Sequence, residues 1–129
     1  MTGLSIAALY SGIMLILLVV LAFNVSLNRQ RAEVSLGTGE DGGLEQAFRV
    51  HANALENILP GMAGLILLAL LETPDLVLHA FGIALVVARL LHAQGLLSAP
   101  GRTFGRFVGT LVSWIALAGM GGFLIFSAF

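Results

Sequence analysis

A run of polar and ionisable side chains between residues 45 and 60 is the part of this sequence most suited to chemistry. Four polar positions recur every three or four residues, and Pro60 continues the same spacing: Glu45, Arg49, Asn53, Glu56 and Pro60. At about 100° per residue they fall within an arc of about 80° on one face of a helix. Guanidinium groups hold carboxylates through paired hydrogen bonds, so this polar stripe could bind a small anionic or zwitterionic molecule.

A second, shorter polar stripe follows later in the chain and contains Arg89 and His92. Glu56 lies eight residues after Phe48 and Arg89 lies eight residues before Leu97, so each is about 12 Å inward at a rise of about 1.5 Å per residue. Because a charge at that depth needs a partner, we predict an ion pair between Glu56 and Arg89. Glu45 and Arg49, spaced at i and i+4, are the predicted second pair.

The composition places both stripes in a membrane. Of the 129 residues, 58% are hydrophobic and 10% are charged, and the mean hydropathy is +1.00. A soluble domain carries charge on about 25% of its residues. The formal net charge of -1 provides no basic surface, which argues against nucleic-acid binding. The chain has no cysteine, so a disulfide framework, a thiolate metal site and a cysteine nucleophile are excluded.

Four apolar stretches are long enough to cross the hydrocarbon core, which needs about 20 residues. We therefore predict an all-α, integral membrane four-helix bundle that forms one domain, with helices over residues 4–27, 45–71, 76–97 and 104–128. All six arginines fall at one end of this bundle. The positive-inside rule then puts both chain termini outside the cytosol.

The polar stripes are open to two interpretations. They could hold the helices together, because polar groups inside a membrane satisfy one another across helix interfaces. They could also form a binding site near the cytosolic face, and the arginines in the neighbouring loops favour this interpretation. No metal site is predicted, because His51 and His92 lie on different helices and no third ligand has suitable spacing.

The segment from Glu45 to Pro60 resembles the second-helix motif of the MAPEG family, the membrane-associated proteins in eicosanoid and glutathione metabolism. It matches the pattern E-x-x-x-R-x-H-x-N-x-x-E-x-x-x-P. The segment from Arg89 to Gly95 is similar to the third-helix motif of the family. Arg102 stands roughly where the family has an arginine before the fourth helix.

The resemblance implies a homotrimer that binds glutathione as a co-substrate between neighbouring subunits, near the cytosolic face. It implies a glutathione transferase or peroxidase that acts on lipophilic small molecules arriving from the membrane lipid, here in a bacterial inner membrane. Arg102 would stabilise the glutathione thiolate and is the expected catalytic residue. The residues expected to bind glutathione are Arg49, Asn53, Glu56, Arg89 and His92.

The sequence also departs from the family pattern. Enzymes of this family often carry tyrosines near glutathione, whereas the corresponding positions here are Asn57, His92 and Leu96. The only tyrosine, Tyr10, lies toward the opposite end of the predicted bundle. A non-catalytic membrane protein that binds lipid or glutathione is therefore the main alternative.

A third class is a small multidrug-type proton antiporter, which also has four short helices. Such proteins carry an essential carboxylate in the first helix. Residues 1–28 contain no charged side chain, so this interpretation is disfavoured.

Overall fold

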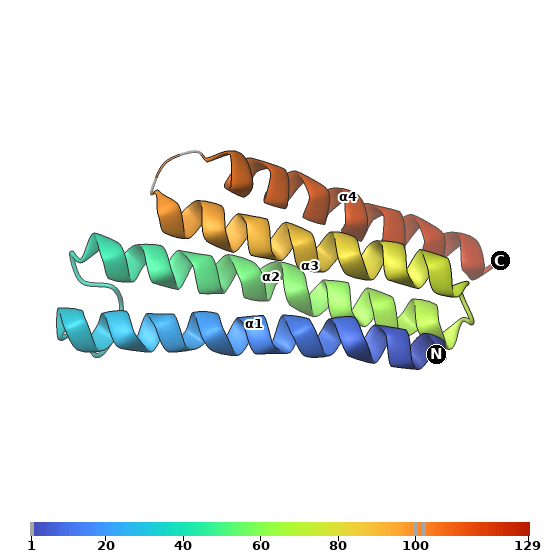
Figure 1. Cartoon of the computed structure of the whole chain (residues 1–129), viewed down its shortest axis with the longest axis horizontal. Helices are drawn as coiled ribbons and strands as arrows, with labels where there is room; N and C mark the ends of the chain where they lie inside the picture. The colour runs from blue at the N-terminus through green and yellow to red at the C-terminus, as the bar shows by residue number, and fades with distance from the viewer. Residues whose placement is uncertain (1, 100, 102) are drawn as a thin grey trace.

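Four apolar stretches of the chain fold as four long helices that lie side by side (Figure 1). This computed structural model describes residues 2–99, 101 and 103–129. The helices are α1 (Gly3–Ala32), α2 (Gly42–Leu70), α3 (Asp75–Ser98) and α4 (Phe104–Ser127). Each is long and apolar enough to cross a membrane, so the predicted all-helical membrane architecture is confirmed. The α2–α3 turn lies at the same end of the bundle as the N- and C-terminal ends of the chain (Figure 1).

The first two helices are longer than the sequence predicted. α1 was expected to end at residue 27 but continues to Ala32, and α2 was expected to begin at residue 45 but begins at Gly42. Arg29 and Arg31 in the last turn of α1 suit the negative end of the helix dipole. At about 1.5 Å per residue both helices are about 45 Å long, which exceeds a hydrocarbon core of about 30 Å. Their charged ends therefore extend beyond the membrane core.

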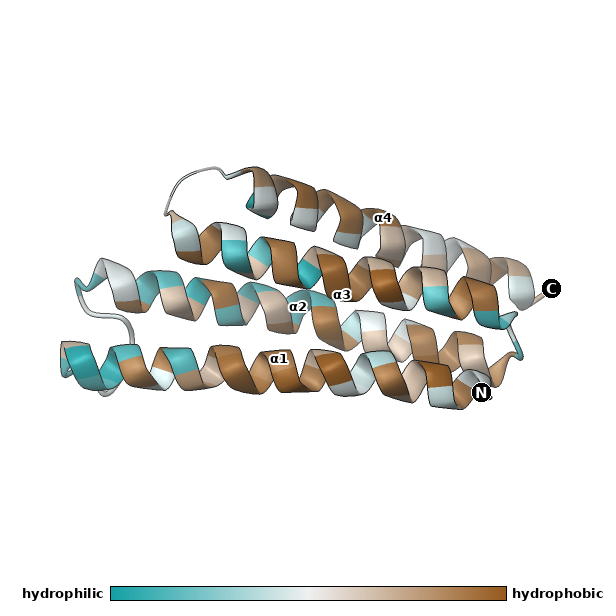
Figure 2. Cartoon of the chain, viewed as in Figure 1, coloured by the Kyte–Doolittle hydropathy of each residue, from teal (hydrophilic) through white to brown (hydrophobic). Residues whose placement is uncertain are grey.

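The packing order follows the chain order. α1 packs mainly on α2, and α4 packs mainly on α3, while α1 and α4 make no contact within the described part of the chain. Large apolar side chains from all four helices fill the core, including Met14, Leu65, Leu85 and Met120. Polar residues gather on the ends of α1 and α2 near their connecting loop (Figure 2). The bundle thus has an apolar body and a polar end at the α1–α2 loop.

Tyr10 of α1 connects to α3 in the half of the bundle away from this polar end. Its ring occupies the space above Gly82, where a Cβ atom would overlap it. The Tyr10 hydroxyl and Nδ1 of His79 are 2.8 Å apart and share a hydrogen bond. Buried Tyr10 is therefore a packing residue between helices.

Asp41 in the loop before α2 gives a prediction about acid sensitivity. Its Oδ1 accepts hydrogen bonds from the Leu44 amide at 2.7 Å and from the Arg31 guanidinium at 2.6 Å. These contacts lower the pKa of Asp41, the Leu44 amide contributing more than Arg31. A lowered pKa means that this stabilisation is complete above the ordinary value of about 3.9 and is lost as the pH falls through the folded-state value. We expect hydrogen-exchange protection at the start of α2 to fall in that acidic range.

The matched control for this prediction is Asp41→Asn, which keeps a side-chain oxygen for the helix cap but carries no titrating charge. Protection of the Leu44 region in this variant should not depend on acidification, after correction for the intrinsic exchange rate. Equal acid sensitivity in both proteins would contradict the assignment to Asp41.

Candidate functional site

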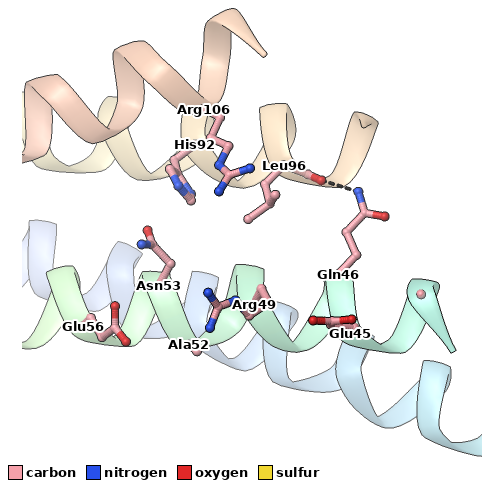
Figure 3. A pocket seen from close by; sticks show the side chains of 10 residues that line it. Glu45, Gln46, Arg49, Ala52, Asn53, Glu56, His92, Leu96 and Arg106 are labelled. Carbon is pink, nitrogen blue, oxygen red and sulfur yellow. Dashed lines mark hydrogen bonds between the residues drawn. The ribbon is translucent and has the colours of Figure 1, made fainter. Parts of the chain in front are cut away.

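A cleft of about 470 Å³ opens between the polar half of α2 and the facing ends of α3 and α4. This volume lies in the range of small-molecule sites, about 300–1,000 Å³. Side chains of α2 face His92 of α3 and Arg106 of α4 across it (Figure 3). The residues that line the cleft are Gly42, Glu45, Gln46, Arg49, Ala52, Asn53, Glu56, His92, Leu96 and Arg106.

Helical periodicity explains why α2 presents its polar stripe away from the core. The buried face of this part of α2 includes Val50, Ala54 and Ile58. Glu56 lies about 200° around the helix from both Ala54 and Ile58, at 100° per residue. Its side chain is exposed, as is that of Arg49. The apolar face holds α2 in the bundle and leaves the charged face open.

Three glycines let α3 and α4 approach closely at the cleft. A Cβ atom on Gly105 would lie 2.7 Å from the Leu91 carbonyl oxygen, and one on Gly109 would lie 2.5 Å from the Ala88 carbonyl oxygen. A Cβ atom on Gly95 would likewise overlap the backbone of α4 near Arg106. This close crossing brings Arg106 to the same cleft as His92.

Arg89 is fully buried behind the cleft, with 1% of its surface exposed. Its Nη1 donates to Oδ1 of Asn53 at 2.8 Å, and its Nη2 donates to the Gly109 carbonyl oxygen at 2.8 Å. The predicted ion pair between Glu56 and Arg89 is therefore wrong. Glu56 faces outward, so Asn53, about one turn earlier on α2, is the partner that Arg89 reaches.

The predicted ion pair between Glu45 and Arg49 is also wrong. Within the described residues the only salt bridge joins Arg31 and Asp41, outside the cleft. Spacing at i and i+4 makes such a pair possible but does not enforce it between exposed side chains, whose pairing gains little in water. The cleft therefore presents two arginines and two glutamates with no ion pair between them in the described part of the chain.

Of the residues predicted to bind a ligand, Arg49, Asn53, Glu56 and His92 come together at the cleft. Arg89 does not line it and contacts it through Asn53. Arg102, the predicted catalytic residue, lies outside the described residues.

Sequence reasoning missed two polar residues of the cleft, Gln46 and Arg106. The Gln46 amide donates to the Leu96 carbonyl oxygen, which ties α2 to α3 at one end of the cleft (Figure 3). Arg106 belongs to the first turn of α4, and its Nη1 makes one long hydrogen bond of 3.4 Å to the Gly101 carbonyl oxygen. The glycines at 105 and 109, four residues apart on α4, are the signal that could have placed Arg106 against α3.

A second pocket, of about 550 Å³, adjoins the cleft along the outer face of α4. Arg106 lines both the cleft and this second pocket. The other walls of the second pocket include the large apolar side chains of Phe107, Leu111 and Trp114. One guanidinium group thus borders a polar and a mainly apolar space.

The fold and the cleft together define an integral membrane protein with four spanning helices and a charged, ligand-sized cleft between three of them. The chain belongs to the MAPEG family, which it matches over residues 7–126. It is 30% identical over 90 residues to inner membrane protein YecN of Escherichia coli strain K12, a match that covers 70% of this chain and 69% of that protein. The same identity and coverage hold for inner membrane protein YecN of Escherichia coli O6:H1 strain CFT073.

Proposed function

We propose that this protein binds glutathione in the cleft and uses it to conjugate or reduce lipophilic electrophiles. The observation that carries this proposal is the charge pattern of the cleft, where two arginines and two glutamates stand beside Asn53 and His92. Glutathione carries one ammonium group, two carboxylates and a thiol. A site that binds it needs acceptors and cationic donors side by side, and membership of the MAPEG family supports this ligand.

Glu56 is the acceptor for the ammonium group in this proposal. Its carboxylate lines the cleft. Pro60 lies inside α2 and has no backbone N–H, so it cannot donate the helical hydrogen bond to the Glu56 carbonyl oxygen. Two acceptor groups of one residue are thereby available to an ammonium ion. Arg49 and Asn53 then face the carboxylates from the same helix.

Arg106 is suited to stabilise the thiolate, because it borders both the polar cleft and the apolar pocket. A free thiol has a pKa of about 8.5 and is mostly protonated at neutral pH. A nearby arginine lowers that pKa and does not itself titrate. The electrophile would enter the apolar pocket from the lipid. The thiolate would form a C–S bond at the electrophilic carbon, while the bond from that carbon to its leaving group breaks and the leaving group departs as an anion, a halide ion in the case of an aryl halide. Arg102 is the other candidate for this role, as the family resemblance implies.

We further propose a homotrimer in a bacterial inner membrane, with both termini outside the cytosol. Glu56 lies at the middle of α2 and is exposed on the single subunit, and a charge that faces lipid costs up to about 2.5–3.5 kcal/mol, the value at the membrane centre on insertion scales. A neighbouring subunit over the cleft would remove that cost and complete the site.

A non-catalytic glutathione- or lipid-binding protein is the second candidate. One observation favours it: none of the described residues that line the cleft carries a hydroxyl group. Activation of the thiol would then depend on arginine alone. Measurable turnover with an aryl halide or a hydroperoxide would exclude this candidate.

Calorimetric titration of the detergent-purified protein with glutathione tests the proposed ligand. We expect saturable binding that weakens about 10- to 100-fold in Arg49→Ala and in Glu56→Gln, because each loses a charge-assisted hydrogen bond worth about 1.5–3 kcal/mol. Glu40→Gln, in the exposed loop, should bind like the wild type. Absence of binding by the wild type at millimolar glutathione would refute the proposal.

A further inference from the structure

Arg89 is a buried cation that does not line the cleft. Its two terminal nitrogens bond to α2 and α4, and its Nε has no hydrogen-bond partner among the described residues. No carboxylate pairs with it in that part of the chain. Asn53 therefore lies between Arg89 and the cleft.

The chemistry of the guanidinium fixes which way the Asn53 amide points. A guanidinium has only donors, so it accepts no hydrogen bond from an amide. The side chain of Asn53 must therefore turn its oxygen toward Arg89, and the 2.8 Å contact is to Oδ1. The two N–H groups of Nδ2 therefore take no part in the contact with Arg89.

Nδ2 of Asn53 remains available to a ligand. It donates to no other described residue, and it is not among the buried atoms that lack a partner. Asn53 itself lines the cleft and is half-buried. In Figure 3 the Asn53 side chain reaches from α2 toward His92 across the cleft.

We infer that Arg89 is a positioning residue that makes Asn53 a hydrogen-bond donor to an acceptor oxygen of the ligand in the cleft. This inference rests on the proposed function and specifies it: the group that meets Asn53 is a carboxylate or a peptide carbonyl oxygen, not an ammonium or an N–H. Arg89 acts only through Asn53 and does not touch the ligand.

Gly109 and Ser113 of α4 form the hydrogen bonds on the opposite side of the Arg89 guanidinium from Asn53. The Gly109 carbonyl oxygen accepts from Arg89 and also from the Ser113 hydroxyl, each at 2.8 Å. Ser113 is fully buried. The guanidinium is thereby held between α2 and α4, which restricts the amide to one orientation.

A double-mutant cycle on glutathione binding tests the inference. Asn53→Ala and Arg89→Met should each weaken binding about 10-fold or more, by loss of one hydrogen bond to a charged group. The double variant should bind no more than about two-fold more weakly than Asn53→Ala alone, because both changes remove the same donor. Additive losses would mean that Arg89 acts independently of Asn53 and would overturn the inference.

Asn53→Asp keeps the inference testable should Arg89→Met fail to fold. The new carboxylate still accepts from Arg89, so the thermal unfolding temperature should not fall, but the donor is gone and glutathione binding should weaken at least 10-fold. Unchanged binding in Asn53→Asp would overturn the inference. Asn28→Ala is the matched control, since the Asn28 side chain likewise donates to a backbone carbonyl oxygen, that of Asn24 on α1, and does not line the cleft.

The outcomes separate this inference from the proposed function. Failure of the wild type to bind glutathione would refute the proposed function. Binding by the wild type together with unchanged binding in Asn53→Asp would leave the proposed function intact and refute only the role of Arg89.

Discussion

Replacing Arg106 with alanine is expected to lower kcat/KM for glutathione conjugation by about 100-fold or more, while glutathione itself still binds. Removing one preorganised donor from a developing anion costs about 10²- to 10³-fold in rate in well-studied sites. Arg106 has the position for this role, because it borders both the cleft and the apolar pocket. Turnover of an aryl halide measures kcat/KM. Ultraviolet titration of the thiol of bound glutathione measures its pKa and shows that glutathione still binds.

The comparison that decides this assignment is Arg102→Ala beside Arg106→Ala. We expect the bound thiol to titrate at a higher pH in Arg106→Ala, and Arg106→Lys to recover part of the rate because it restores a positive charge. Arg29→Ala, which removes a cation from the α1 end and not from the cleft, should retain full activity. Full activity in Arg106→Ala with loss in Arg102→Ala would move the role to Arg102.

Gly109→Ala is expected to destabilise the fold by about 1–3 kcal/mol, the usual cost of an added methyl group in a well-packed interior. The new Cβ would lie 2.5 Å from the Ala88 carbonyl oxygen and 2.7 Å from Cβ of His92. Backbone atoms cannot rotate out of the way, so α3 and α4 must separate. That separation would also move Arg106 away from His92, so glutathione binding should weaken together with stability.

Denaturant unfolding in detergent micelles measures the stability loss. Gly121→Ala is the control on the same helix, because a Cβ there meets no atom of the described chain within 4 Å. Its stability should be unchanged or slightly higher, since alanine favours helix over glycine. Equal stability of Gly109→Ala and the wild type would contradict the close crossing of α3 and α4.

The number and order of the helices could be predicted because each apolar stretch is as long as a membrane span. The helix ends near the arginines could not be predicted from hydropathy. α1 continues to Ala32 through polar residues, and its end is set by the left-handed backbone of Glu33, with φ of 55°. α2 starts earlier than predicted because Asp41 caps it in front of two glycines.

The α2 part of the site could be predicted because Arg49, Asn53 and Glu56 share one face by helical periodicity. The contacts between helices could not. Depth counted along two helices paired Arg89 with Glu56, whereas rotation of α2 about its axis turns Glu56 outward and leaves Asn53 as the partner. Periodicity within one helix gives the direction of a side chain relative to its own helix, and the facing helix has to be placed independently.

The burial of Arg89 between α2 and α4 also constrains how the chain enters the membrane during synthesis. Its two partners, Asn53 and the Gly109 carbonyl oxygen, lie on the helices made before and after α3. α3 released alone into lipid would expose an unpartnered guanidinium near the middle of the bilayer, at a cost of about 2.5–3.5 kcal/mol. α2 can offer Asn53 as a hydrogen-bond partner to Arg89 as soon as α3 emerges. We therefore expect α2 and α3 to enter the lipid as a pair, and α4 to join them last.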